Sequence, residues 1–342
     1  MFNQEEIIKN LEALVSINSP SGYTDKAIDF VETYVKDLGY ETEITPKGNL
    51  IVSVDGENPI PVRALSAHVD TLGLMVRSIN GDGSLSMTTL GGPLTPTLDG
   101  AYCDIITRDN KTYTGTILST STSIHVYKDA STKPRDIDNL RVIIDENVKT
   151  KEDVLNLGIQ NGDIIAYDPK FKFTSSGFIK SRFLDDKASV AILLAVLKDI
   201  KEDNIKLKSP LKFIFTVYEE VGHGASYIPS DIEELLAVDM GAIGDNLACS
   251  EYDVSICAKD SSGPYDYALT TSLINMAKEK DLDYAVDIYP MYGSDASAAL
   301  RGGANIRAAL IGPGVANSHG MERTHIKALE NTYKLILSYI NI

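Results

Sequence analysis

The chain has 342 residues, 43% of them hydrophobic, and a formal net charge of -16. This length is enough to bury a substantial core in one large domain or in two unequal ones. The excess of acidic residues argues against nucleic acid and anionic membrane surfaces as partners, because both would repel the chain. No apolar run is long enough to span a bilayer and the N-terminus shows no secretion signal, so we expect a cytoplasmic protein.

The N-terminal part predicts two helices followed by two strands. Apolar residues recur at helical spacing over residues 7–15 and 28–38. The apolar runs 49–54 and 62–67 are typical of strands, and the second of them ends at His68.

The middle of the chain, residues 74–168, has a different character. Short β-type runs are separated there by Gly, Asp, Asn and Pro, with little helical periodicity. This pattern favours an all-β insert, a small barrel or sandwich, within an α/β domain. We therefore predict a catalytic domain formed by residues 1–73 and 169–342 and interrupted by the insert.

Alternation of helices and strands returns in the last part, as an α/β fold requires. Helices are predicted over residues 188–200, 267–280, 295–301 and 325–340. Strands are predicted over residues 211–217, 235–238, 284–289 and 306–311.

Histidine and acidic residues stand at the ends of several of these elements, where open α/β folds gather active-site groups. They are His68 with Asp70, Asp185 with Asp186, Glu219 with Glu220, Asp239, and His319. Residues two apart on a strand share a face, so Asp70 can orient the imidazole of His68 while the other ring nitrogen binds a metal. Two consecutive glutamates point in different directions, so one can ligate while the other faces a water.

Taken singly, each position has an ordinary structural explanation. A histidine at a strand end can bond a loop carboxylate, and an aspartate before a helix, such as Asp186, is most often an N-cap. Asp185, fixed at the same helix start, has two oxygens that can bridge two metal ions. Together these five groups of residues can supply one histidine and one acid for each of two divalent ions, and a further acid that bridges the two ions. This donor set suits zinc, cobalt or manganese.

The order His-x-Asp, Asp-Asp, Glu-Glu-Val-Gly, Val-Asp and a late histidine resembles that of the M42 metallo-aminopeptidases, the glutamyl or TET-type aminopeptidases. The resemblance covers nearly the whole chain, including residues 19–22, residues 48–50 and the β insert. It implies a phosphorylase/hydrolase-like catalytic domain with a mixed sheet, a barrel-like dimerisation insert and two divalent ions. It also implies peptide substrates with a free N-terminus and a homo-oligomer, in this family a tetrahedral dodecamer.

Carried over by position, the resemblance implies a set of ligands for each ion. One ion would be held by His68, Asp185 and Asp239. The other would be held by Asp185, Glu220 and His319.

The resemblance further implies that Glu219 is the general base and that Asp70 is the partner of His68. The late motif, residues 319–325, departs from the family's usual His-Ser-Pro-x-Glu, which leaves His325 as an alternative to His319. A loop before a helix suits a ligand better than a position within the helix, and this favours His319.

The expected function is that of an aminopeptidase with two metal ions, and two other functions stay open. A glycoside hydrolase could use the glutamate pair, and some members of the family have been called cellulases (cellulase M), but such an enzyme would not need the two histidines. A non-catalytic oligomeric binding protein on the same fold would turn over no aminoacyl substrate even with metals present.

Overall fold

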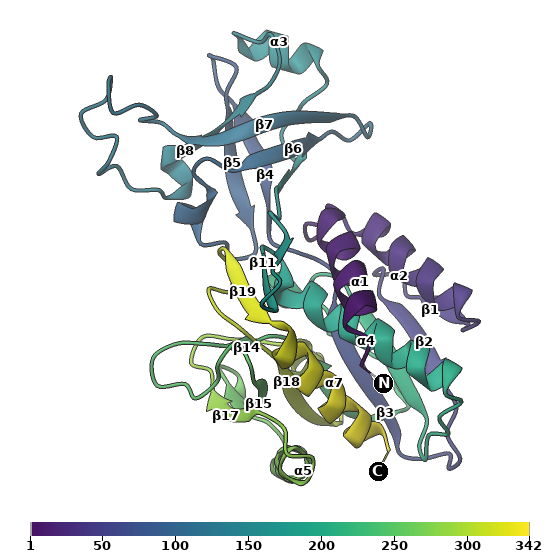
Figure 1. Ribbon diagram of the computed structural model, residues 1–342. Helices are drawn as coiled ribbons and strands as arrows, with labels where there is room; N and C mark the ends of the chain where they lie inside the picture. Colours follow the sequence, from purple (N-terminus) through teal and green to yellow (C-terminus); the bar gives the residue numbers. More distant parts are fainter. Residues whose placement is uncertain (1, 342) are drawn as a thin grey trace. The chain divides into compact units, whose positions relative to one another are not determined.

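The computed structural model describes residues 2–341, and the chain divides into two compact units (Figure 1). One unit comprises residues up to 70 and from 170 onward, and the other comprises residues 71–169. Among residues 2–341, no helix combines the length and the apolar character that crossing a membrane requires.

The larger unit is built on a mixed sheet with the strand order β1-β2-β12-β3-β13-β18-β15-β16, to which β14 adds beside β18 and β17 beside β15. In chain order, the first five strands of this sheet are β1 (Thr42–Ile44), β2 (Leu50–Val54), β3 (Val62–His68), β12 (Leu211–Thr216) and β13 (Ile232–Val238). The others are β14 (Gly241–Ala242), β15 (Val254–Asp260), β16 (Gly263–Pro264), β17 (Tyr284–Ile288) and β18 (Arg307–Val315). A second small sheet joins β10 (Lys172–Phe173), β11 (Phe178–Ser181) and β19 (Glu322–His325).

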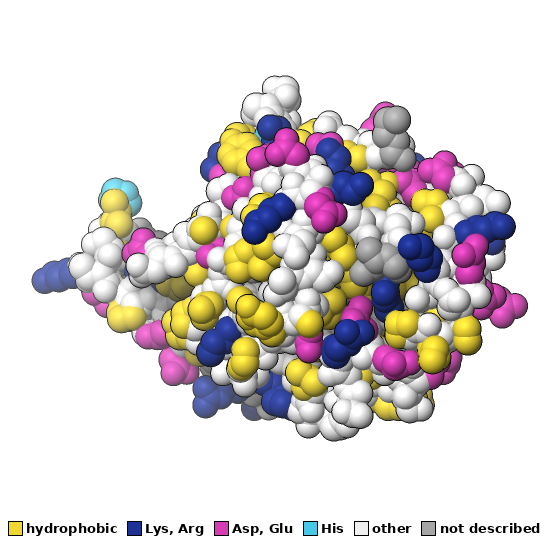
Figure 2. All heavy atoms as spheres, turned by 90° about the horizontal axis from the view of Figure 1, so that it is seen from below, with side chains coloured by type: hydrophobic (Ala, Val, Ile, Leu, Met, Phe, Trp, Pro, Cys, Tyr) yellow, Lys and Arg dark blue, Asp and Glu magenta, His cyan; other side chains and the backbone are white. Residues whose placement is uncertain are grey.

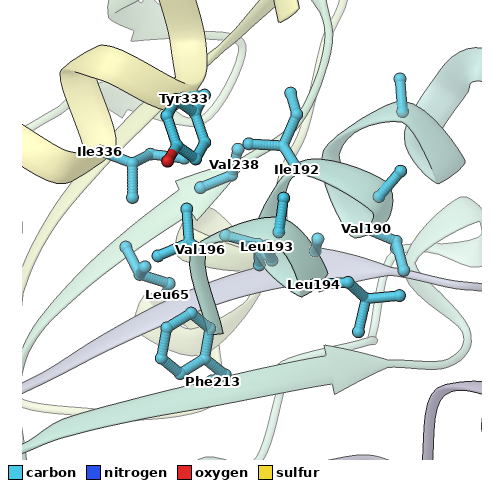
Figure 3. Close-up of a cluster of buried hydrophobic side chains, with 14 of the residues drawn as sticks. Leu65, Val190, Ile192, Leu193, Leu194, Val196, Phe213, Val238, Tyr333 and Ile336 are labelled. Atoms are coloured by element: carbon cyan, nitrogen blue, oxygen red, sulfur yellow. The ribbon is translucent and has the colours of Figure 1, made fainter. Parts of the chain in front are cut away.

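Helices cover both faces of the large sheet. They are α1 (Gln4–Ser16), α2 (Asp25–Asp37), α4 (Leu184–Glu202), α5 (Tyr267–Glu279), α6 (Asp295–Arg301) and α7 (Ile326–Ile340). Helix α4 packs against β3 on one side and against α1 and α7 on the other, which explains why nearly all of its side chains are buried. Figure 3 shows α4 side chains such as Leu193 and Val196 gathered with Leu65 and Phe213 of the sheet and with Ile336 of α7.

Alternate residues of the central strands enter two different cores. Leu236 and Val238 of β13 belong to the core beneath α4, whereas Leu235 and Ala237 belong to a second core that includes α6 residues such as Ala296. Strands that are buried on both faces are continuous apolar runs, and this is why the sequence signals them so clearly.

The smaller unit is a closed barrel with the strand order β4-β5-β8-β7-β6-β9. Its strands are β4 (Gly73–Ile79), β5 (Leu85–Leu90), β6 (Tyr102–Ile106), β7 (Thr112–Ser119), β8 (Leu140–Ile144) and β9 (Ile164–Tyr167), and it also carries α3 (Lys151–Asn156). The predicted fold class, a mixed-sheet α/β domain with an inserted barrel-like β domain, is confirmed.

Several element boundaries differ from the prediction. Strand β18 runs to Val315, four residues beyond the predicted end, because Gly312 and Pro313 do not interrupt it. An added Cβ at Gly312 would lie 1.3 Å from the carbonyl oxygen of Asp239, so glycine is needed there for the close approach of two backbones. Strand β15 was absent from the prediction altogether.

Opposite charges are interspersed on the face of the molecule seen in Figure 2, where Lys and Arg side chains lie among Asp and Glu and exposed apolar groups. Neighbouring charges of opposite sign on this face therefore offset one another locally, despite the net charge of -16.

Candidate active site

Three central strands bring predicted site residues to one edge of the sheet. Strands β12 and β13 both run parallel to β3, with Thr216 at the end of β12 opposite His68 at the end of β3. Glu219 and Glu220 follow β12, and Asp239 follows β13. The carboxyl ends of parallel strands meet at one edge, so these side chains converge.

Asp185 lies between the two histidines of the cluster. One of its carboxylate oxygens, Oδ1, is 3.1 Å from His68 Nε2, and the other, Oδ2, is 3.6 Å from His319 Nε2. Asp185 and Asp186 have non-helical backbone angles, although they stand at the start of α4. The Asp186 carboxylate accepts a hydrogen bond from the backbone N–H of His68 at 3.2 Å, which ties the start of α4 to β3.

The structure separates the two candidate late histidines. His319 lies in the loop between β18 and β19, with Nε2 3.5 Å from Glu220 Oε2. His325 instead caps α7 through Nδ1, which accepts from the backbone N–H of Lys327, and its Nε2 is 2.9 Å from the carbonyl oxygen of Ser176. Of the two histidines, His319 is the one that contacts the carboxylate cluster.

Asp70 anchors the turn that carries the two glutamates. Its carboxylate accepts hydrogen bonds from the backbone N–H groups of Glu219 at 3.0 Å and Glu220 at 3.3 Å, and from the hydroxyl of Ser21. His68 Nδ1 is 2.9 Å from the Asp70 carbonyl oxygen but 3.6 Å from the carboxylate. The Asp70 backbone therefore orients the imidazole, a task that we expected of its side chain.

Two further buried carboxylates, Glu322 and Asp295, hold the backbone around the site. Glu322 accepts hydrogen bonds from the backbone N–H groups of Asp185 and His319, both at 3.1 Å. Asp295 accepts from the hydroxyl of Thr216 and, at 2.8 Å, from the backbone N–H of Ala225. The spacing of Glu322, three residues after His319, is the one sequence signal that could have pointed to this role.

Burial makes the charged forms of these carboxylates costly. It raises the pKa of Glu219 and of Glu220 well above the ordinary value, and nearby carboxylates add to the effect. It also raises the pKa of Asp239 to about 7, with the charge of Asp185 as the next cause. A bound cation would relieve both the desolvation and the mutual repulsion of these groups.

The donor atoms fit divalent metal ions. Ligand atoms of His68, Asp185 and Glu220 all lie within 4.8 Å of one another, and so do those of His68, Glu219 and Asp239. Within residues 2–341, Glu220 Oε1 is buried without a hydrogen-bond partner, as expected of an oxygen available to a metal. A mixture of imidazole and carboxylate ligands suits zinc and other first-row divalent ions.

The cluster opens into a pocket of about 740 Å³. Besides the carboxylates and His319, the pocket is lined by Met240, Ala242, Ser261, Met291, Tyr292 and Arg301, among others. This volume is in the range of pockets that bind small ligands.

Residues 48–335 match the sequence profile of the M42 glutamyl aminopeptidases. The chain belongs to the M42 peptidase family. YhfE from Bacillus subtilis, provisionally named an aminopeptidase, is 47% identical over 341 residues, or 99% of each chain.

Two solved peptidase structures resemble this chain over nearly its full length. The aminopeptidase APDkam598 from the archaeon Desulfurococcus kamchatkensis has a TM-score of 0.87 at 25% identity, covering 99% of this chain and 95% of that one. The TET1 peptidase of Pyrococcus horikoshii has a TM-score of 0.84 at 25% identity, covering 98% and 99%. The M42 chain is thus a peptidase of a metal-dependent aminopeptidase family, which confirms the enzyme class expected from the sequence.

Gly224→Ala should lower kcat by about 10-fold or more, because displacements of about 1 Å near a reacting group can cost up to about 100-fold. An added Cβ would lie 2.4 Å from Asp295 Oδ1 and 3.1 Å from Glu219 Cα, so the turn would have to move. Peptidase kinetics with metal analysis check this. In Gly244→Ala, the matched control, the added Cβ would meet no atom within 4 Å. Equal kcat values for the two variants would contradict the expectation.

Proposed function

We propose that this M42 peptidase removes the N-terminal residue of peptides with the help of two divalent ions. His68, Asp185 and Asp239 would hold one ion, and Asp185, Glu220 and His319 the other. The observation that carries the proposal is the position of Asp185, whose two carboxylate oxygens face the two histidines separately.

Two divalent ions, zinc or cobalt or manganese, would lower the pKa of a water molecule and polarise the scissile carbonyl group. Hydrolysis also needs a group that moves the proton from the water to the departing amine. We assign this step to Glu219, because it lies beside the proposed ligands, with Oε2 3.7 Å from His68 Nε2. In the metal-free protein burial raises the pKa of Glu219, and bound cations would lower it again towards the range in which a carboxylate accepts a proton.

In the proposed reaction Glu219 accepts a proton as the water oxygen bonds to the carbonyl carbon. It then donates that proton to the amide nitrogen as the carbon–nitrogen bond breaks. The Asp70 carboxylate fixes the backbone of both glutamates, because it accepts hydrogen bonds from their N–H groups. A free α-amine bound at the same cluster would confine cleavage to the first residue of the peptide.

Hydrolysis of aminoacyl-nitroanilides, with and without added zinc, cobalt or manganese, tests the proposed function. We expect activity that requires a free α-amine, is lost on chelation and returns with metal. Nitroanilide hydrolysis that survives chelation would contradict the metal requirement, and no turnover with metals present would favour a non-catalytic protein. Hydrolysis of a glycoside that survives chelation would favour the glycoside-hydrolase alternative. The family membership already favours a peptidase over both.

We also propose that the chain assembles into a homo-oligomer, with the barrel of residues 74–168 as the dimerisation domain and a tetrahedral dodecamer as the expected form. The Pyrococcus horikoshii TET1 peptidase assembles into a tetrahedron or a large octahedral shell, and it resembles this chain over nearly its full length. Light scattering tests this, because each chain has a mass of 37.2 kDa. A monomeric mass would contradict the proposal.

Metal binding should weaken as the pH falls below the pKa of Asp239, which is about 7 in the metal-free protein. Below that pH a proton occupies the carboxylate and must leave before an ion binds, so the affinity should fall about tenfold per pH unit for each displaced proton. Calorimetric titration with cobalt at about pH 6 and about pH 8 measures the change. Equal affinities would contradict the expectation.

The stability of the metal-free protein should fall as the pH rises, whereas the metal affinity rises with pH. Because the folded-state pKa of Asp239 is raised from 3.8 to about 7, the folded state binds more protons than the unfolded state between these values. This contribution to stability is therefore lost as the pH rises through that window. Thermal unfolding of the metal-free protein at the same two pH values provides the comparison.

A further inference from the structure

The turn between β1 and β2 lies beside the segment that follows β12. The antiparallel pairing of the start of β2 with the end of β12 brings this turn, residues 45–49, next to residues 217–226, which include Glu219. The turn is closed by hydrogen bonds from the Thr45 N–H to the Asn49 carbonyl oxygen at 2.9 Å and from the Asn49 N–H to the Thr45 hydroxyl at 3.1 Å. It therefore provides a fixed base for side chains that reach the neighbouring segment.

Lys47, in this turn, uses its whole ammonium group to hold that segment. Its Nζ donates to the carbonyl oxygen of His223, to that of Gly224 at 3.1 Å and to the hydroxyl of Ser226 at 2.7 Å. An ammonium group has three N–H donors, and here each has an acceptor within four consecutive residues. The Ser226 hydroxyl in turn donates to the His223 carbonyl oxygen at 3.0 Å, so the acceptors are also linked to one another.

Gly224 connects these hydrogen bonds to Glu219. Its carbonyl oxygen accepts not only from Lys47 but also from the side-chain amide of Asn49, at 3.1 Å. An added Cβ on Gly224 would lie 3.1 Å from the Cα and 3.2 Å from the Cβ of Glu219, so the glycine packs closely against that residue. A shift of Gly224 would therefore move Glu219 directly.

Charges of both signs hold the backbone of this segment. The carboxylates of Asp70 and Asp295 accept hydrogen bonds from the N–H groups of the two glutamates and of Ala225. The ammonium group of Lys47 binds two of the carbonyl oxygens. Burial lowers the pKa of Lys47, and the negative charges of the same two carboxylates oppose this effect. The cation and the two anions therefore stabilise one another while they fix the backbone between them.

We propose that Lys47 is a positioning residue that holds the Glu219 carboxylate in the orientation for proton transfer, and that it does not contribute to binding the metal ions. This inference rests on the proposed function, because that function makes Glu219 the general base. Glu220 has contacts of its own, since its N–H is bound by Asp70 and its Oε2 lies 3.5 Å from His319 Nε2. Loss of Lys47 should therefore affect Glu219 and leave the proposed ligands in place.

Peptidase kinetics and elemental analysis test the inference in the wild type, Lys47→Met and Lys47→Arg. Lys47→Met should lower kcat by about 10- to 100-fold, because displacements of about 1 Å near a reacting group can cost up to about 100-fold. KM should stay within about twofold, as expected when only the transition state is affected, and both ions should remain bound. Lys47→Arg should restore part of kcat, since it keeps the positive charge and the N–H donors. An unchanged kcat in Lys47→Met, or a loss of metal in step with kcat, would overturn the inference.

The matched control is Lys201→Met, which changes an exposed lysine of α4 whose Nζ also donates to a backbone carbonyl oxygen, that of Gly39, at 3.2 Å. Its kcat should equal that of the wild type. Thermal unfolding of both variants shows how much stability each has lost, which separates a general loss of stability from a loss of position. If Lys201→Met lowers kcat as much as Lys47→Met does, the inference is overturned while the peptidase function stands.

Hydrogen–deuterium exchange separates this inference from the proposed reaction, because it needs no substrate. In the metal-loaded proteins, backbone amides of residues 217–226 should exchange faster in Lys47→Met than in the wild type, and those of the barrel unit should exchange equally. Should the wild type cleave no aminoacyl-nitroanilide with metals present, the proposed function fails, and the exchange rates still decide whether Lys47 holds the segment. Equal exchange of residues 217–226 in the two proteins would overturn the role of Lys47.

Discussion

Glu219→Gln should lower kcat by about 10²- to 10⁴-fold while the protein keeps both metal ions, because the change removes a proton acceptor but preserves the shape of the side chain. Glu219 is part of the buried cluster, and its backbone N–H is held by Asp70 irrespective of the side chain. The turn should therefore stay in place in the variant. Peptidase kinetics together with elemental analysis check the expectation, and substrate binding should change much less than kcat.

Glu220→Gln is the matched variant, since it alters the neighbouring residue of the same turn. Glu220 Oε2 lies 3.5 Å from His319 Nε2, on the side of the second proposed ion. We expect this variant to lose part of one metal, and added metal to restore some of its activity. If Glu219→Gln lost a metal while Glu220→Gln stayed loaded and inactive, the two roles would have to be exchanged. If neither variant lost activity, the proposed mechanism would be wrong.

The sequence predicts the site residues that stand at the ends of apolar strands. His68 is the last residue of a strand buried on both faces and Asp239 directly follows another, so a polar residue there is conspicuous in the sequence. The same pattern makes the central strands predictable. The distance between the ends of these strands could not be predicted, because that distance depends on the order of the strands in the sheet.

Contacts between residues far apart in the chain also could not be predicted from the sequence. Ser21 donates to Asp70 across 49 positions, and Glu322 accepts from the Asp185 backbone across 137 positions. No spacing rule covers such pairs, because any buried carboxylate can find its donors on another element. The Asp186 carboxylate is a further example, since it accepts from the backbone N–H of His68 across 118 positions.

Strand boundaries were hard to predict where a residue that usually interrupts strands is required by packing. Gly312 and Pro313 normally argue against a strand interior. Here the glycine lets β18 approach the Asp239 carbonyl oxygen, and the strand continues to Val315. The same close approach fixes the backbone of a proposed ligand, so the missed boundary lies next to the site.

Asp185→Asn should have the largest effect on metal content, because one carboxylate serves both proposed ions. Its two oxygens face His68 Nε2 at 3.1 Å and His319 Nε2 at 3.6 Å, and an amide keeps the shape but replaces one oxygen with a hydrogen-bond donor. We expect at most one ion per chain and a loss of at least about 100-fold in kcat/KM, since a two-metal site acts as one unit. Elemental analysis and peptidase kinetics measure both.

Asp186→Asn is the control for that variant, because Asp186 is the adjacent, equally buried carboxylate and is not a proposed ligand. An amide keeps the shape of the Asp186 side chain and still carries an oxygen that can accept a hydrogen bond. That oxygen can accept from the His68 backbone N–H, which lies 3.2 Å from the Asp186 carboxylate in the structure. Both ions and most of the activity should therefore be retained. Loss of both ions in Asp186→Asn, with full loading in Asp185→Asn, would assign the bridging position to Asp186, because only a ligand carboxylate is needed for loading.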